Sequence, residues 1–196
     1  MRILGVDGSL TCTGLALVDT DESGLDDSLL GSGTIRTGTD GDDTDRCETI
    51  ATGVVAIALR YEVDLVALEM PFVDPKRNHQ VALRLAGLRS VVEGALRKAG
   101  IEFVGVAPSS RLKAIGINGR GMGRAAIKAA TIEHVARRFA VIVKTDDEAD
   151  AYCVAKAGLV KWRKGQRQAV QLALGIPAGR KRSKRERGKP CTAERR

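Results

Sequence analysis

Short apolar runs alternate along the chain with longer stretches in which apolar residues recur at helical spacing. Five apolar runs predict β-strands, at residues 2–7, 13–18, 29–35, 64–69 and 101–107. Helical spacing predicts helices at residues 47–58, 78–98, 109–113 and 127–139, and again from residue 145. Strands that alternate with helices in this way predict an α/β fold.

Two of the predicted strands end in a carboxylate. The strand at residues 2–7 ends at Asp7, and the strand at residues 64–69 ends at Glu69. If these two strands are parallel neighbours, both carboxylates lie side by side at the edge of the sheet where α/β proteins bind ligands. One acid at the end of a strand is weak evidence for a site, so the argument depends on further acids.

A third group of acids opens the last predicted helix. Four acids occur within residues 146–150, just before an apolar run. Thr145 and Glu148 have the spacing of a capping box, in which two side chains satisfy free backbone N–H groups. Asp147 and Asp150 then share one helix face. Paired carboxylates beside apolar residues favour a cation between them, and Mg²⁺ prefers oxygen ligands. Acids in a first turn also favour the helix dipole alone, so a structural role stays open.

The composition fits one core made of aliphatic side chains. The chain has 196 residues, of which 43% are hydrophobic and only 3% aromatic. Its four cysteines are scattered, so we expect reduced thiols rather than zinc sites or disulfides. No apolar run approaches the ~20 residues of a membrane span, and the N-terminus lacks a signal-peptide pattern. These features predict a cytoplasmic protein without membrane contacts.

The positive charge is concentrated at the C-terminal end. The net charge of the chain is +8, but residues 161–196 carry +11 and residues 1–160 carry −3. A basic segment of this kind suits a polyanion such as nucleic acid. A solubilising or nonspecific tail is the alternative interpretation.

The ordered set of motifs resembles the RuvC Holliday-junction resolvases of the RNase H-like superfamily, a family with bacterial and bacteriophage members. The opening segment Ile3–Ser9 is similar to the first strand of that family. Glu69 followed by Phe72 resembles the family's acid and its nearby aromatic residue. Residues 78–89 fit the family's long helix, and residues 147–151 fit its closing D-x-x-D-A motif. The resemblance implies a mixed five-stranded sheet, with the first three strands antiparallel and helices on both faces.

The resemblance also implies roles for single residues. Four carboxylates would hold two Mg²⁺ or Mn²⁺ ions and form the catalytic centre together with the cation Arg124, namely Asp7, Glu69, Asp147 and Asp150. A further set would contact DNA, namely Phe72, Lys76, Arg77, Arg111, Lys113, Arg120 and Lys128. Phe72 would stack on a base near the junction centre. Ordinary surface charge is the alternative for the basic residues, and Phe72 could instead pack its loop onto the sheet.

The implied function is a metal-dependent endonuclease that resolves four-way DNA junctions as a homodimer. Paired symmetric nicks would leave 5′-phosphate and 3′-hydroxyl ends, and the apolar face of the 78–98 helix is the candidate dimer surface. We expect a nuclease domain over residues 1–162 and a basic, partly disordered extension over residues 163–196.

Two alternative functions remain open at this point. One is another RNase H-like nuclease that cuts flaps, or that processes RNA in the manner of YqgF. The other is a non-catalytic DNA-binding module, which would leave the acidic positions unexplained. An ATP-binding protein of the kinase or actin type would need a second domain, and the chain is short for that.

Overall fold

The computed structural model describes residues 1–21, 26–38, 41–71 and 79–173. The chain divides into two compact units, Met1–Trp162 and Arg163–Arg196. The last helix, α5 (Asp146–Ala173), continues beyond Trp162, where the apolar pattern weakens. Its final residues are mostly Lys, Arg, Gln and Ala, which have a high intrinsic helix propensity.

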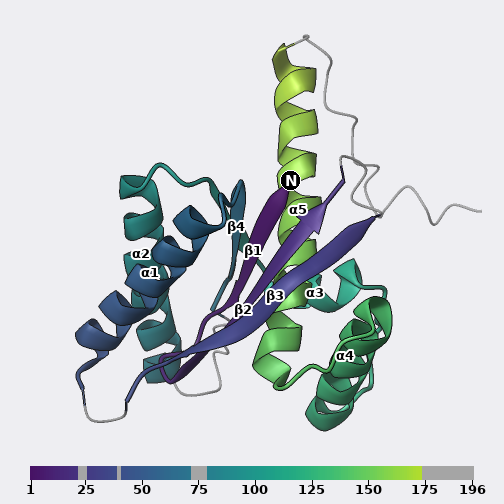
Figure 1. The fold of residues 1–196 in the computed structure, drawn as a ribbon, viewed down its shortest axis with the longest axis horizontal. Coiled ribbons are helices and arrows are strands. Elements are labelled where there is room, and N and C mark those ends of the chain that lie inside the picture. The colour runs from purple at the N-terminus through teal and green to yellow at the C-terminus, as the bar shows by residue number, and fades with distance from the viewer. Residues whose placement is uncertain (22–25, 39–40, 72–78, 174–196) are drawn as a thin grey trace, which may run out of the picture. The chain divides into compact units, whose positions relative to one another are not determined.

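The core of the first unit is a five-stranded mixed sheet. Its strands are β1 (Arg2–Asp7), β2 (Cys12–Thr20), β3 (Asp27–Arg36), β4 (Leu65–Glu69) and β5 (Phe103–Val106). They lie in the order β3-β2-β1-β4-β5. Strands β1, β2 and β3 are antiparallel, whereas β4 runs parallel to both β1 and β5. The predicted mixed sheet with three antiparallel leading strands is therefore confirmed (Figure 1).

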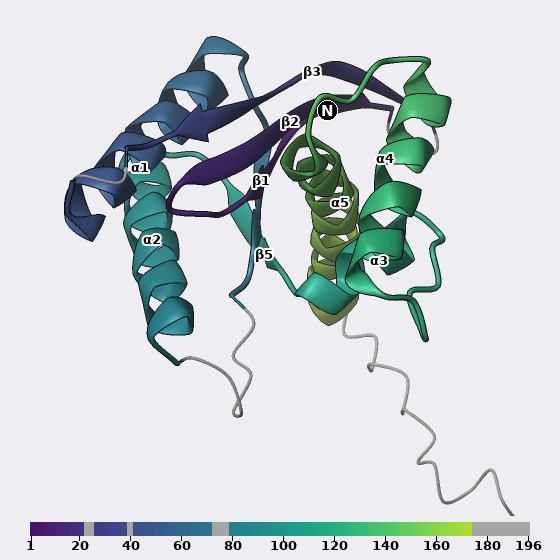
Figure 2. The ribbon, with the colours of Figure 1, turned by 90° about the horizontal axis from the view of Figure 1, so that it is seen from below.

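Helices cover both faces of the sheet, as predicted (Figure 2). Helices α1 (Asp43–Arg60) and α2 (His79–Lys98) lie on one face. Helix α5 lies on the other face beside α3 (Pro108–Ala114) and α4 (Arg124–Phe139). In β1, Leu4 and Val6 join the α1–α2 core and Ile3 joins the α5 core, because successive strand residues point to opposite faces.

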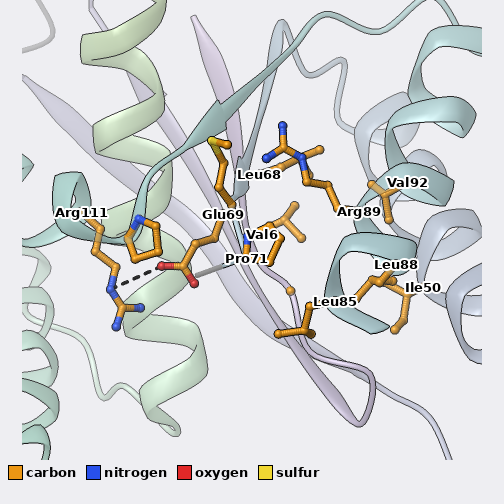
Figure 3. Close-up of a pocket in the computed structure, with 13 residues that line it drawn as sticks. Val6, Ile50, Leu68, Glu69, Pro71, Leu85, Leu88, Arg89, Val92 and Arg111 are labelled. Atoms are coloured by element: carbon orange, nitrogen blue, oxygen red, sulfur yellow. Dashed lines mark ion pairs between the residues drawn. The ribbon is translucent and has the colours of Figure 1, made fainter. Parts of the chain in front are cut away.

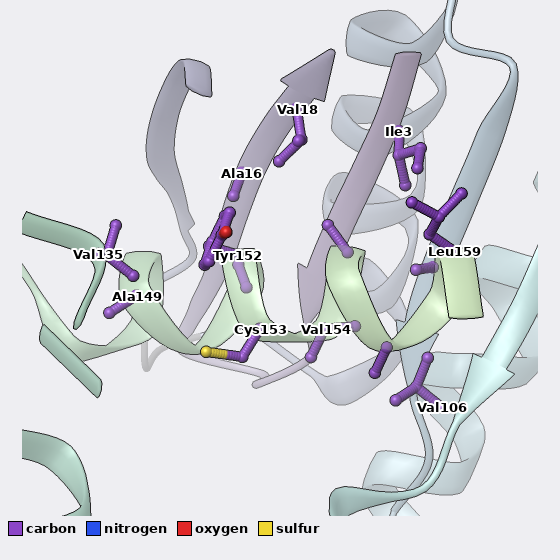
Figure 4. Packing of buried hydrophobic residues seen from close by; sticks show 14 of the residues in the cluster. Ile3, Ala16, Val18, Val106, Val135, Ala149, Tyr152, Cys153, Val154 and Leu159 are labelled. Carbon is purple, nitrogen blue, oxygen red and sulfur yellow. The ribbon is translucent and has the colours of Figure 1, made fainter. Parts of the chain in front are cut away.

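Helix α5 lies unusually close to the sheet because glycines and alanines meet at the contact. A Cβ atom on Gly5 would stand 2.0 Å from the backbone oxygen of Ala151, and one on Gly14 would stand 2.1 Å from that of Asp147. The facing positions of α5 are small and buried, including Ala151 and Ala155. Figure 4 shows buried side chains of α5 packed against the sheet. Only glycine at β1 and β2 leaves room for the helix backbone.

The first turn of α5 differs from the predicted capping box. The Thr145 hydroxyl accepts the backbone N–H of Glu148 at 3.3 Å, which is one half of the motif. The Glu148 carboxylate instead accepts a hydrogen bond of 2.6 Å from the Ser32 hydroxyl on β3. Because β3 passes the start of the helix, Glu148 links the helix to the sheet.

A buried carboxylate on β3 joins the two helices of the same face. Asp27 accepts hydrogen bonds from the Tyr152 hydroxyl at 2.9 Å and from Arg138 at 2.8 Å. The Lys156 ammonium lies 3.1 Å from the same carboxylate. These partners come from α4 and α5. The negative charge of Asp27 therefore has partners on both helices and fixes them against β3.

No helix within the described part of the chain combines the length and apolar character that crossing a membrane would require.

We expect Gly14→Ala to destabilise the protein by about 1–3 kcal/mol, because the added methyl group would overlap the α5 backbone at Asp147. Gly31→Ala on β3 is the matched control, since nothing lies within 4 Å of its added Cβ. Urea denaturation followed by circular dichroism measures both. Equal stability of the two variants would contradict the close helix–sheet contact.

Candidate active site

The ends of β1 and β4 bring Asp7 and Glu69 together. The parallel register pairs Val6 with Leu68, so the next residue of each strand is an acid. The two carboxyl groups share a hydrogen bond, and both are partly buried. The register of the two strands accounts for this contact, because each acid directly follows the last paired residue of its strand.

Helix α5 adds the second pair of acids from the opposite direction. The Asp150 carboxyl is buried, and its charge acts on Asp7. Asp147 lies one turn earlier, at the point where the helix backbone meets Gly14. Its charge also acts on Asp7, so all four predicted acids belong to one electrostatic cluster.

Arg111 of α3 reaches into this cluster. Its Nη1 atom lies 2.7 Å from Oδ2 of Asp150, and its Nε atom lies 3.7 Å from Oε1 of Glu69. The pair with Glu69 is visible in Figure 3. The Arg111 side chain is only 21% exposed, so its guanidinium belongs to the centre of the site rather than to the surface.

The surroundings of Asp7 and Asp150 disfavour the negatively charged form of each carboxyl group. Burial first, and then the hydrogen bond and charge of Glu69, together raise the pKa of Asp7 to about 8. Burial also raises the pKa of Asp150, although the Arg111 guanidinium opposes that shift. At neutral pH, Asp7 therefore carries a proton and donates its hydrogen bond to the Glu69 carboxylate.

The donor chemistry of this cluster fits a hard divalent cation, because carboxylate oxygens are the ligands that Mg²⁺ and Mn²⁺ prefer. In the described ranges, however, no three His, Cys, Asp or Glu side chains stand together in an arrangement that would hold a metal. Arg111 takes up the space and charge between Glu69 and Asp150.

An open cavity of about 290 Å³ adjoins the acids. Its walls are mainly apolar side chains of β1, β4 and α2, with Glu69 and Arg111 at one side (Figure 3). Arg89 of α2 also lines it and is fixed by an ion pair of 2.6 Å with Glu93. Of the four candidate acids, Glu69 therefore lines this cleft directly.

The other predicted cations lie on α3, on α4 and on the connection between them. Lys128 pairs with Asp146 at the start of α5, and its charge acts on Asp150. Lys113 of α3 and Arg124, the first residue of α4, are both exposed, as is Arg120. Among these cations, Lys128 is the one that the structure brings into electrostatic contact with the acids.

Some predicted positions fall outside the described residues. Phe72, Lys76 and Arg77, together with the proposed helix cap Asn78, lie between the end of β4 and the start of α2. Their DNA-contacting roles stay predictions.

Sequence reasoning missed Cys12, whose thiol is hydrogen-bonded to Asp147. Burial, and then this contact, raise the pKa of the thiol, so it stays protonated and donates to the carboxylate. Cys12 lies two residues before Gly14 on β2, so both positions share a face. No signal in the sequence pointed to this contact, because the approach of Asp147 to Gly14 is seen only in the structure. The inward direction of Arg111 had no signal either.

Comparisons with known proteins find one family of relatives for this chain. Residues 3–157 match the family model described as Crossover junction endodeoxyribonuclease RuvC. The RuvC of Delftia acidovorans is 34% identical over 159 residues, which cover 79% of this chain and 82% of that protein. The RuvC of a Nocardioides species is 29% identical over 185 residues, which cover 94% of this chain and 100% of that protein.

A solved structure shows the same fold. The Thermus thermophilus RuvC in complex with a Holliday junction substrate superposes with a TM-score of 0.68 at 20% identity, covering 84% of this chain and 97% of that chain. The sheet order and the helices on both faces are therefore those of the RNase H-like fold of that protein. A yeast mitochondrial Holliday junction resolvase shows a weaker similarity, with a TM-score of 0.54 at 13% identity.

We expect the metal-free protein to lose stability relative to Asp7→Asn as the pH rises from about 4 to above 8. Below the ordinary pKa of 3.8, Asp7 is protonated in both the folded and the unfolded chain. Between 3.8 and about 8, only the folded chain holds the proton, and this stabilising contribution is lost as the pH passes the folded value. Asparagine has no charge to bury.

Between the lower and the higher pH, the parent should lose at least about 1.4 kcal/mol of unfolding free energy relative to Asp7→Asn, which is the equivalent of one pKa unit. Urea denaturation in EDTA at pH 5 and pH 8.5 measures it. Asp45→Asn, at an exposed position of α1, is the control and should follow the parent at both pH values. A constant gap for Asp7→Asn would show that this carboxyl titrates normally.

Proposed function

The chain belongs to the RuvC family of crossover junction endodeoxyribonucleases, and from that premise we propose that its acidic cluster cleaves four-way DNA junctions. The observation that carries the proposal is the convergence of Asp7, Glu69, Asp147 and Asp150 from two strands and one helix. A non-catalytic DNA-binding module would have no use for acids that must be buried against their own repulsion.

We assign the four carboxylates as the ligands of Mg²⁺ or Mn²⁺, with room in the donor set for two ions. A bound divalent pair supplies the positive charge that makes a water molecule more nucleophilic and that stabilises the leaving oxygen of a phosphodiester. The residues of the chain fix the position of that charge. Asp7 and Glu69 are set by strand register, and Asp147 and Asp150 are set by the contact of α5 with β1 and β2.

We assign the cations of α3 and α4 to the DNA backbone. Lys128 is held by Asp146 and its charge acts on Asp150, so it is placed to contact the phosphate that is cleaved. Arg124, Arg120 and Lys113 are exposed and suited to flanking phosphates, which provide most of the affinity of DNA-binding proteins. Phe72, Lys76 and Arg77 are proposed DNA contacts by family resemblance alone.

We propose that the protein acts as a homodimer through the outer face of α2. The apolar face on which the sequence prediction rested includes Leu88 and Val92, which the structure buries in the protein's own core. The opposite face carries Leu83, which is 70% exposed. Gly87 and Gly94 follow on that face and have open space around them. A two-fold dimer would match the near two-fold symmetry of a four-way junction.

Leu83→Glu should convert the dimer to a monomer and replace paired nicks by single, uncoordinated nicks, because it puts a charge into the apolar contact. Sedimentation velocity gives the oligomeric state, and a supercoiled cruciform plasmid reports paired against single nicks. Val160→Glu on α5 is the control, since Val160 is 60% exposed on the opposite side of the sheet. If both variants remain dimers, the outer face of α2 is not the interface.

Asp147→Asn should lower the rate of junction cleavage by about 100-fold or more, the scale of loss when a group that stabilises transition-state charge is removed. Binding of the junction should be retained, because Lys and Arg contacts to phosphate supply it. Synthetic four-way junctions with and without Mg²⁺, matched linear duplexes and gel-shift titrations measure both properties. Asp45→Asn is the control for the loss of one negative charge. Cleavage at the parental rate would exclude Asp147 from the site.

A further inference from the structure

The guanidinium of Arg111 occupies the position in the acidic cluster where positive charge is needed. It lies 2.7 Å from Asp150 and 3.7 Å from Glu69. Two of the four proposed metal ligands are therefore engaged with one side chain. Figure 3 shows the guanidinium extending from α3 toward Glu69 at the edge of the cleft.

Arg111 is well suited to stand in for a cation that can be exchanged. An arginine keeps its charge at all relevant pH values and presents several N–H donors that suit carboxylates. Its long side chain begins on α3, a helix of seven residues with none of them buried, so the backbone that carries it is at the surface. Rotation of the side chain could move the guanidinium out of the cluster without unpacking the core.

We propose that Arg111 is the internal counter-ion of the metal-free site, and that a divalent cation must displace it from between Glu69 and Asp150. This inference rests on the proposed function, in which the four acids hold the metal. It explains why these acids are gathered in the described part of the chain but do not form a ready set of three ligands. Arg111 keeps them apart and partly neutralised.

The displaced guanidinium has a second partner available. Once it leaves the acids, it lies at the edge of the cleft, where the scissile strand would pass in the proposed function. A backbone phosphate attracts a guanidinium by paired, charge-assisted hydrogen bonds. DNA would then favour metal binding by drawing Arg111 away, and metal would favour DNA binding by the same factor, because coupling between two ligands is reciprocal.

The test is the affinity of the full-length protein for Mn²⁺ in the absence of DNA, with free Mn²⁺ measured by its electron paramagnetic resonance signal. Arg111→Gln should bind Mn²⁺ about tenfold more tightly or better, since the metal no longer competes with a charge-assisted contact. Lys113→Gln removes one positive charge from an exposed position of the same helix and should bind as the parent does. Arg111→Lys, which keeps the charge without the planar fork, should fall between.

Thermal unfolding provides a second measurement. Without metal, Arg111→Gln should melt earlier than the parent, because the acids lose their counter-ion. Saturating Mn²⁺ should raise its melting temperature by more than it raises that of the parent. If Arg111→Gln binds Mn²⁺ as the parent does or more weakly, or if Lys113→Gln tightens binding equally, the counter-ion role is wrong.

Asp150→Asn separates this inference from the proposed function. If Asp150→Asn loses the Mn²⁺ binding of the parent while Arg111→Gln binds Mn²⁺ as the parent does, the acids are the metal site. In that case only the proposed competition between Arg111 and the metal is wrong. If neither the parent nor Arg111→Gln binds Mn²⁺ at millimolar concentration, the metal site itself is wrong, and the counter-ion inference fails with it.

Discussion

The close contact of α5 with the sheet is the constraint on which the site depends. Gly5 and Gly14 allow the helix backbone to approach β1 and β2 so closely that any side chain at either position would overlap it. This contact sets the depth at which Asp147 and Asp150 reach the sheet, while strand register sets Asp7 and Glu69. A displacement of the helix would separate the two pairs of acids, so the packing of the core and the geometry of the site have one cause.

The same contact creates an electrostatic cost. Bringing the acids together in a partly buried place raises the pKa of Asp7 and of Asp150. Two devices relieve the repulsion, namely the proton shared between Asp7 and Glu69 and the guanidinium of Arg111. Both compensations are weaker than a divalent cation would be. In the proposed function, a divalent cation bound by these acids would relieve this cost.

The two faces of the sheet have different tasks. On one face, α1 and α2 cover an aliphatic core that contains no member of the acidic cluster, and α2 leaves Leu83 exposed on its outer face. On the other face, α4 and α5 are fixed by the buried Asp27, which gathers Tyr152, Lys156 and Arg138. That network holds α4 and α5, which carry Lys128, Asp147 and Asp150.

The sequence by itself determined the strands, the helices and the four acids, because hydrophobic period and strand-end carboxylates are local features, as in Ile3–Asp7 and Leu65–Glu69. The parallel contact of β1 with β4 was only a condition in the sequence analysis, and the structure meets it. Only the tertiary structure decided the partners of long side chains. Glu148 binds Ser32 instead of closing a full capping box, Cys12 contacts Asp147, and Arg111 turns inward to the acids. Such contacts join residues far apart in the chain, and their geometry depends on how closely α5 and α3 approach the sheet, which no local pattern encodes.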